Sequence, residues 1–298
     1  MNVKESVQRQ FAPVAERYAV SAVHASGPDL TAMLDAAMLL GTERALDAGC
    51  GTGHTALAFA PRVAAVVGVD LTEEMLDQAR RLAAERGIAN ATFERGDVEA
   101  LAFPDAAFDL TTSRFSAHHY PHPRRAMREL ARVLRPGATL LLVDTVAPDD
   151  AAQDRFLNRI ETLRDPSHAR DYTIAKWHEM LTSAGFQVMT RQIWPLRLDF
   201  ASWVTRMATP TAGVREIERM MDAAPREVRE RFAIEPDHSF SIPVALLQAT
   251  LSPSPDAGRG GSNPHPPTPS PVRGRGGSNP HPPTPSPVRG RGGVVGRN

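Results

Sequence analysis

Apolar and polar positions along the first half of the chain predict strands and helices in alternation. The continuous apolar run at 63–70 predicts a strand that is buried on both faces of a sheet. A shorter strand is expected to end near Leu46, and apolar residues at helical spacing predict a helix at 73–86. Further strands are expected at 92–96, 108–113 and 139–143. This order predicts a doubly wound α/β fold with a parallel sheet covered on both faces.

The rest of the chain predicts mainly helices around two more strands. Residues 1–40 have helical spacing that is interrupted at Gly27-Pro28. Helices are also expected at 149–184 and about 201–232, and strands at 186–193 and near 240–250. Because Pro243 has no N–H to donate, we expect it at the start of the last strand or at a bulge. Methionine and tryptophan side chains in the second helical stretch either roof a pocket or pack as in ordinary helices.

From Ser252 the composition changes to proline, glycine and arginine, and the 16-residue segment 260–275 is repeated at 276–291. Such a sequence cannot bury a core, so we predict a disordered tail at 252–298 and one domain at 1–251. Arginine–glycine tails can contact RNA, but the duplication favours an inert tail. The tail contributes six arginines and one aspartate, a charge of +5. Because the whole chain has no net charge, the domain carries −5, which disfavours a nucleic-acid-binding core.

The single cysteine, Cys50, excludes an intrachain disulfide and fits a reducing compartment. Its place between two glycines favours a small loop residue over a reactive thiol. The N-terminus lacks the apolar core of a signal peptide, and no apolar run reaches the length of a bilayer. We therefore expect a cytoplasmic protein without membrane contact.

The sequence Ala-Leu-Asp-Ala-Gly-Cys-Gly-Thr-Gly at 45–53 joins a predicted strand to a predicted helix through three alternating glycines, Gly49, Gly51 and Gly53. Glycines allow a sharp turn and close approach of a ligand, and N–H groups at a helix start form a cradle. Two ligands fit this cradle. The match of 51–56 to G-x-G-x-x-G/A suits a nicotinamide dinucleotide. In contrast, the carboxylate of Asp47 would repel a pyrophosphate but suits the ammonium group of S-adenosylmethionine.

A polar residue ends or follows each of four predicted strands, namely Asp47, Asp70, Asp97 and Ser113. Ligands of such sheets bind at the carboxyl ends of the strands, so we expect these residues to share one site. Asp70 lies about 20 residues beyond the glycine loop, where a carboxylate accepts ribose hydroxyls. Asp97 is either an ordinary acid in a surface turn or an acceptor for the adenine amino group, and its position after the third predicted strand favours the second. Leu71 packs either against adenine or in the core.

Two histidines, His118 and His119, follow the fourth predicted strand and are the candidate catalytic residues. A histidine can take a proton from an oxygen or nitrogen acceptor, whereas an activated carbon needs little such help. Both a catalytic role and the role of ordinary loop residues therefore stay open. Together with His122 they also suggest a metal site, but the lack of an accompanying acid disfavours it.

In combination and order, these motifs resemble the class I S-adenosylmethionine-dependent methyltransferases, in particular the small-molecule branch that includes quinone-biosynthesis enzymes. The resemblance spans about 11–250 and is carried by residues 46–53, 68–70, 96–99, 103–105, 108–110 and 133–137. It implies a Rossmann-like sheet of seven strands, mostly parallel, with the last strand antiparallel. It also implies an N-terminal helical cap at 1–40 and a helical substrate lid at 195–237.

The resemblance implies where the cofactor binds. Its methionine end would lie over Gly49 and Gly51, beside Cys50, and its ribose on Asp70. Its adenine would lie near Asp97 and Val98. The capping helices would bring Tyr18 and His24 over the cofactor, although surface packing is the alternative for both side chains.

We therefore expect transfer of a methyl group from S-adenosylmethionine to a small-molecule acceptor. Whether the methylated atom is oxygen, nitrogen or carbon stays open, as does the oligomeric state. Two alternatives also stay open: a nicotinamide-dependent oxidoreductase, which would bind NAD(H), and a non-catalytic protein that only binds the cofactor.

Overall fold

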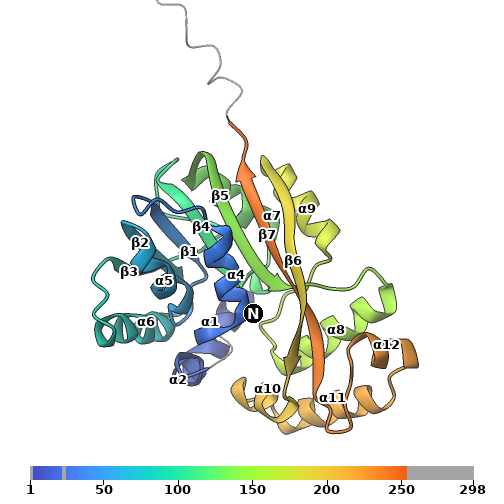
Figure 1. The fold of residues 1–298 in the computed structure, drawn as a ribbon. Helices are drawn as coiled ribbons and strands as arrows, with labels where there is room; N and C mark the ends of the chain where they lie inside the picture. The colour runs from blue at the N-terminus through green and yellow to red at the C-terminus, as the bar shows by residue number, and fades with distance from the viewer. Residues whose placement is uncertain (1–2, 22–24, 254–298) are drawn as a thin grey trace, which may run out of the picture. The chain divides into compact units, whose positions relative to one another are not determined.

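A computed structural model describes residues 3–21 and 25–253, which fold around one seven-stranded sheet (Figure 1). The strand order is β3-β2-β1-β4-β5-β7-β6. The strands are β1 (Arg44–Ala48), β2 (Ala65–Asp70), β3 (Ala91–Arg95), β4 (Phe108–Arg114), β5 (Leu134–Thr145), β6 (Phe186–Leu198) and β7 (Phe240–Leu251). The pairs among β1 to β5 are parallel, whereas β7 is antiparallel to both β5 and β6. The predicted sheet, with its antiparallel last strand, is confirmed.

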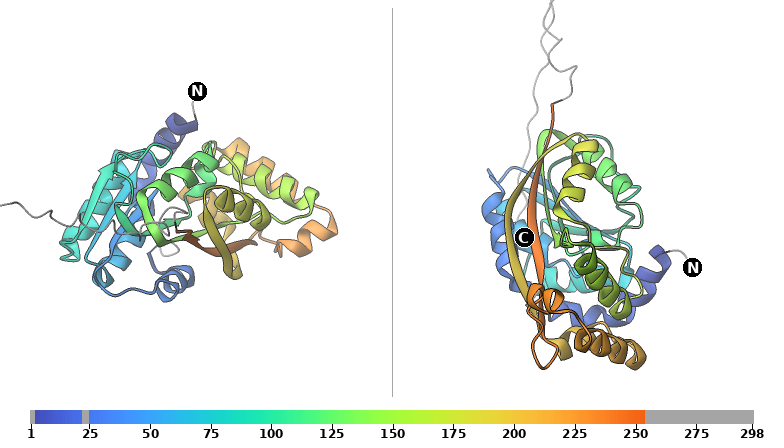
Figure 2. Two further views of the ribbon diagram at one scale, coloured as in Figure 1. Left: turned by 90° about the horizontal axis from the view of Figure 1, so that it is seen from above. Right: turned by 90° about the vertical axis from the view of Figure 1, so that its right-hand side faces the viewer.

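Helices cover both faces of the sheet, because successive strand side chains point to opposite faces (Figure 2). On β5, for example, Leu142 packs in the cluster of one face and Leu141 in the cluster of the other. The first face carries α7 (Pro123–Val133) and α9 (Ile174–Ser183), and the second carries α4 (Pro28–Ala36), α5 (His54–Phe59) and α6 (Glu73–Glu85). The short 3-10 turn η2 (Ala60–Arg62) follows α5.

The N-terminal helices pack against two separate parts of the fold. They are α1 (Val3–Phe11), the 3-10 turn η1 (Ala12–Val14) and α2 (Ala15–Ala19). Tyr18 packs with Met75 of α6 and with Met207, which follows α10. The N-terminal segment therefore bridges the glycine-loop side of the sheet and the helices of the second half.

Strands β6 and β7 extend beyond the end of β5 as a two-stranded ribbon. The last pair of β7 with β5 is Val244–Thr145, whereas β7 continues to pair with β6 as far as Phe240–Leu198. Pro243 lies in this ribbon opposite Pro195, next to the point where pairing with β5 stops. The ribbon and the helices α8 (Ala151–Arg164), α10 (Phe200–Arg206), α11 (Thr211–Asp222) and α12 (Arg226–Arg231) share a third hydrophobic cluster (Figure 1).

Several element boundaries differ from the predictions, and the helix expected at about 201–232 is divided into α10, α11 and α12. Three further differences are the largest. The helix expected at 149–184 is divided at 165–173, because Pro166 disfavours helical backbone at Asp165. Strand β5 begins at Leu134 rather than 139, since Leu134 pairs with Phe108 ahead of a bulge, so the Arg-Pro-Gly sequence lies inside the strand. Strand β6 continues through 195–198, and the helices of the expected lid therefore begin at Phe200.

No helix in 3–21 or 25–253 combines the length and apolar character needed to cross a membrane. The predicted tail lies almost wholly outside these ranges, so its disorder and its inertness stay predictions.

Candidate functional site

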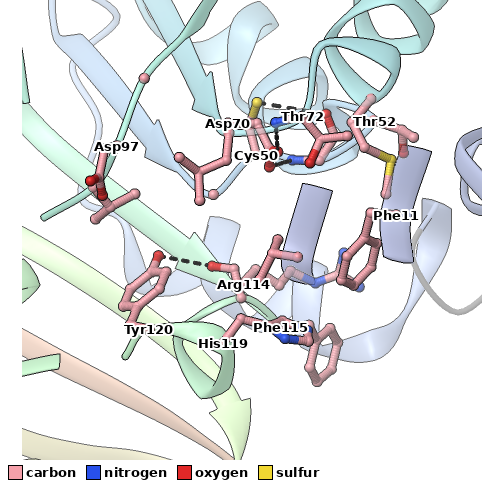
Figure 3. Close-up of a pocket in the computed structure, with 18 of the residues that line it drawn as sticks. Phe11, Cys50, Thr52, Asp70, Thr72, Asp97, Arg114, Phe115, His119 and Tyr120 are labelled. Carbon is pink, nitrogen blue, oxygen red and sulfur yellow. Dashed lines mark hydrogen bonds between the residues drawn. The ribbon is translucent and has the colours of Figure 1, made fainter. Parts of the chain in front are cut away.

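A cavity of about 910 Å³, its open mouth included, lies at the carboxyl ends of the parallel strands (Figure 3). We call it the first cavity. Its walls are the glycine loop after β1, the residues that follow β2, β3 and β4, and side chains from α1 and α2. Figure 3 shows Asp70 and Thr72 on one side of this cavity and Phe115 and His119 on the other. This is the sheet edge at which the sequence predicts a ligand.

The glycine loop presents bare backbone to the first cavity. Gly51 has a positive φ of 51°, and a Cβ built on it would meet no described atom within 4 Å. Gly49 has a φ of 69°, and its Cβ would lie 2.6 Å from Ser116 Oγ. Both residues line the cavity together with Cys50. A side chain at Gly49 would collide with the wall, and one at Gly51 would take space from a ligand.

Gly53 does not line the cavity and packs closely against α6 and β3, so its contact with a cofactor stays a prediction. It precedes α5 with a φ of 81°, and a Cβ there would lie 2.8 Å from Ala79 Cβ and 2.9 Å from Phe93 Cε1.

We expect Gly53→Ala to lower the free energy of unfolding by about 2–4 kcal/mol, from overpacking and left-handed strain together. Gly87→Ala is the control, because Gly87 has a φ of 63° but no described neighbour within 4 Å of its Cβ position. Urea unfolding should show the larger loss for Gly53→Ala, and equal losses would contradict the packing role.

Asp70 ends β2 and reaches into the first cavity. Its Oδ2 accepts the Gly51 N–H at 2.8 Å and its Oδ1 accepts the Thr72 N–H at 2.9 Å. Burial raises the pKa of this carboxyl. A carboxylate offers about four acceptor positions, so Asp70 holds the loop and retains capacity for ligand hydroxyls. Leu71 also lines the cavity.

Asp97 lines the cavity after β3 and is tied to the N-terminal helix. Lys4 Nζ of α1 lies 2.7 Å from Asp97 Oδ2 and 2.6 Å from Glu99 Oε2. The other Asp97 oxygen, Oδ1, accepts the Glu99 N–H at 2.9 Å. Val98 lines the cavity beside this ion pair. Sequence reasoning missed Lys4, since 93 residues separate it from Asp97 and no local pattern links them.

Asp47 and Ser113 lie beneath the cavity and do not line it. Asp47 is 1% exposed; its Oδ1 accepts the Thr112 hydroxyl at 2.7 Å and its Oδ2 accepts the Ala56 N–H at 3.1 Å. Burial raises its pKa to about 6. Ser113 Oγ lies 3.0 Å from Ser116 Oγ and 3.1 Å from the Tyr120 hydroxyl. Direct contact of either residue with a cofactor stays a prediction, and the structure shows them supporting the loop and wall.

A second cavity adjoins the first, between the segment that follows β4, the end of β5, the β6–β7 ribbon and the helices α8 and α10. It is lined by Phe11, Tyr18, Phe115, His118, His119, Thr145, Glu161, Arg164, Leu196, Leu198, Trp203, Arg206 and Ile242. Four of these residues, Phe11, Tyr18, Phe115 and His119, line the first cavity as well. The other capping residue named from the sequence, His24, lies outside the described residues.

The turn η3 (Ala117–His119) places two histidines with opposite protonation states at this junction. His118 Nδ1 lies 2.6 Å from Asp144 Oδ1, and the His118 N–H donates to Asp144 Oδ2 at 3.0 Å. Burial lowers the pKa of His118, but the interaction with Asp144 outweighs it and raises the pKa to about 9. His118 is therefore charged at neutral pH. Asp144 was missed, although it ends an apolar strand just as Asp70 does.

His119 is neutral at neutral pH. Its Nδ1 lies 3.1 Å from the Ser167 carbonyl oxygen, which can only accept, so the proton belongs on Nδ1 and Nε2 carries the lone pair. Nε2 lies 3.8 Å from Asp165 Oδ2, whose charge opposes the lowering of the His119 pKa. Burial and the positive charge of His118 lower the pKa of His119 to about 4. The two rings lie 4.3 Å apart between centroids, and the ring of Phe11 meets His119 edge-on at 5.0 Å.

Comparison with known proteins identifies methyltransferases. Residues 46–142 match a family model described as a methyltransferase domain. The chain is 39% identical over 243 residues to the uncharacterised methyltransferase YcgJ of Bacillus subtilis, covering 80% of this chain and 96% of that protein. It is 36% identical over 148 residues to the demethylmenaquinone methyltransferase of Thermus thermophilus, covering 48% of this chain and 67% of that enzyme. The crystal structure of YcgJ superposes with a TM-score of 0.74 at 37% identity, over 76% of this chain and 99% of that one.

Proposed function

The chain belongs to the S-adenosylmethionine-dependent methyltransferases, and from this premise we propose that the first cavity binds the methyl donor and the second the acceptor. The observation that carries the proposal is the shared wall of the two cavities, in which His119, Tyr18, Phe11 and Phe115 face both. Because the cavities adjoin at these four residues, a donor in one and an acceptor in the other would lie side by side, as transfer in a dry, aligned site requires.

The residues of the first cavity fit S-adenosylmethionine. Bare backbone at Gly51 gives room for the methionine end, and Asp70 has acceptor capacity left for the ribose. Leu71 and Val98 offer apolar contact to adenine beside the acidic Asp97. When bound, this cofactor supplies a methyl group on a positively charged sulfur. The chain contributes binding, orientation and exclusion of water.

We assign the proton-accepting role to His119, because its neutral ring lies in the wall between the cavities. Its Nε2 takes the proton from an oxygen or nitrogen acceptor as the new bond forms. His118 lines only the second cavity and is held by Asp144, so it faces the acceptor as a fixed positive charge. Burial first, and that charge second, lower the pKa of His119, so its ring is unprotonated at neutral pH.

The proposal is tested by calorimetry followed by a transfer assay. The purified protein should bind S-adenosylhomocysteine, the product form of the cofactor, and should leave NADH unbound. With methyl-labelled S-adenosylmethionine and a metabolite extract, label should appear in a small molecule. Binding of NADH instead would favour the oxidoreductase alternative and would overturn the donor assignment. The comparisons give no support to that alternative. Binding of the cofactor without any labelled product across the extracts would point to the non-catalytic alternative.

A further inference from the structure

We propose that the acceptor of the second cavity is an organic anion: an apolar body with a carboxylate, sulfonate or phosphate group that pairs with Arg206. The inference rests on the proposed function, since it gives the chemical class of the molecule in the acceptor cavity. The lining charges and the apolar walls support it separately.

The charged side chains that line the second cavity do not balance. Arg164 Nη1 lies 3.4 Å from Glu161 Oε2, and its Nε donates to the Trp203 carbonyl at 3.1 Å. His118 is paired with Asp144. Glu161 is the one carboxylate among the described lining residues, and its charge acts on both Arg164 and Arg206, so two guanidinium groups face one carboxylate.

Arg206 is also incompletely hydrogen-bonded, although its guanidinium has a side-chain hydrogen bond with Tyr18. It ends α10, and its Nε is buried without a hydrogen-bond partner in residues 3–21 and 25–253. Burial and the nearby charge of Arg164 lower its pKa. Leaving a buried guanidinium N–H without an acceptor is unfavourable. An anion bound in the cavity would accept from Nε and offset the repulsion between the two arginines, and the guanidinium fork matches planar oxyanions.

The acids behind the wall do not supply this partner, because each is engaged elsewhere. Asp165 Oδ1 accepts from the Ser167 N–H at 2.8 Å and from its hydroxyl at 2.6 Å. Asp171 accepts the Thr145 hydroxyl, and burial raises its pKa to about 7, which reduces its negative charge. Neither of the two lines the cavity.

The other side chains that line the second cavity are mostly apolar and suit an acceptor with an apolar body. Leu196, Leu198 and Ile242 come from the β6–β7 ribbon, and Trp203 comes from α10. The Trp203 ring also lies 5.1 Å from Arg164 Cζ, which places an aromatic surface beside the charged end of the cavity. Such a site favours an amphipathic acid over either a neutral hydrocarbon or a small inorganic anion.

A matched pair of fluorescent probes tests the charge requirement. 8-Anilinonaphthalene-1-sulfonate and N-phenyl-1-naphthylamine share one aromatic body and differ by the sulfonate. Binding is measured by fluorescence titration with and without saturating S-adenosylhomocysteine. We expect the sulfonate to bind more tightly, and Arg206→Gln to weaken it by about tenfold or more while changing the neutral probe less than about twofold.

Two further variants test where the probes bind and which charge the site prefers. Glu161→Gln removes the cavity's carboxylate and should tighten sulfonate binding. Arg155→Gln, an exposed change on the same helix as Arg164, should leave both probes unaffected. Equal binding of the two probes, or equal effects of Arg206→Gln and Arg155→Gln, would overturn the anion site. Cofactor binding by each variant is recorded separately, so a failure of the donor assignment is distinguishable from a failure of this inference.

Discussion

Replacing Asp70 by alanine is expected to weaken the binding of S-adenosylhomocysteine by about 100-fold or more. Two hydrogen bonds from ribose hydroxyls to a carboxylate contribute about 1.5–3 kcal/mol each, and every 1.4 kcal/mol is tenfold in affinity. The substitution also removes the acceptors of the Gly51 and Thr72 N–H groups, which should loosen the loop to which we assign the methionine end. Isothermal titration calorimetry measures the loss directly.

The control is Asp77→Ala, an exposed acid on α6 that pairs with Arg80 outside the first cavity. Its affinity for the cofactor product should equal that of the parent chain. Asp70→Asn, which retains one acceptor oxygen, should fall between the parent and the alanine variant. Unchanged affinity in Asp70→Ala, with a normal unfolding transition, would refute the assignment of the ribose to this residue.

His119→Ala is expected to lower kcat by about 100-fold, within the usual range for removal of a general base, while cofactor affinity stays within about twofold. His178→Ala is the matched control. His178 of α9 forms a hydrogen bond with Thr190 of β6, and it lines neither cavity. The measurement is steady-state kinetics with the acceptor found in the labelled screen. A variant rate equal to that of the parent would leave His119 as a wall residue only.

The pH dependence gives this assignment a second, independent readout. A base must be unprotonated, so the rate should fall as the pH drops through the pKa of His119, at about 4 rather than at the ordinary 6.5. His118→Asn removes the positive neighbour that helps to lower this pKa, and the acid limb should move toward higher pH. NMR titration of the imidazole resonances tests the same shift without a substrate. An acid limb that stays in place would show that His118 does not control the protonation of His119.

The local pattern of apolar and polar residues was sufficient to predict the sheet and several of the side chains at the carboxyl ends of its strands. The apolar run into Asp70 located both β2 and the carboxylate that the structure places in the first cavity. The same pattern, an apolar run that leads into an aspartate, marks Asp144 near the end of β5, and attention to it would have identified the partner of His118. Asp47 shows the limit of such reasoning, since a strand-end acid can point under a loop instead of into the ligand space.

Other parts of the site depend on contacts that no short stretch of sequence contains. Lys4 reaches Asp97 only because α1 packs across the sheet edge. Arg206 faces the second cavity only because the chain returns there after the β6 strand. The early start of β5 follows from the pairing of Leu134 with Phe108, which places Arg-Pro-Gly inside the strand directly after α7 ends at Val133. These features are tertiary in origin.

The paired ends of the β6–β7 ribbon have a consequence for how acceptor choice changes between related enzymes. The chain leaves the sheet after Leu198 and re-enters it at Phe240, directly across the ladder from where it left. The segment between these two points, which includes Trp203 and Arg206, is therefore an insertion whose two ends lie next to each other in the sheet. We expect that replacing residues 199–239 by the corresponding segment of a relative would change the acceptor to that of the relative. The affinity of the first cavity for S-adenosylhomocysteine should stay the same.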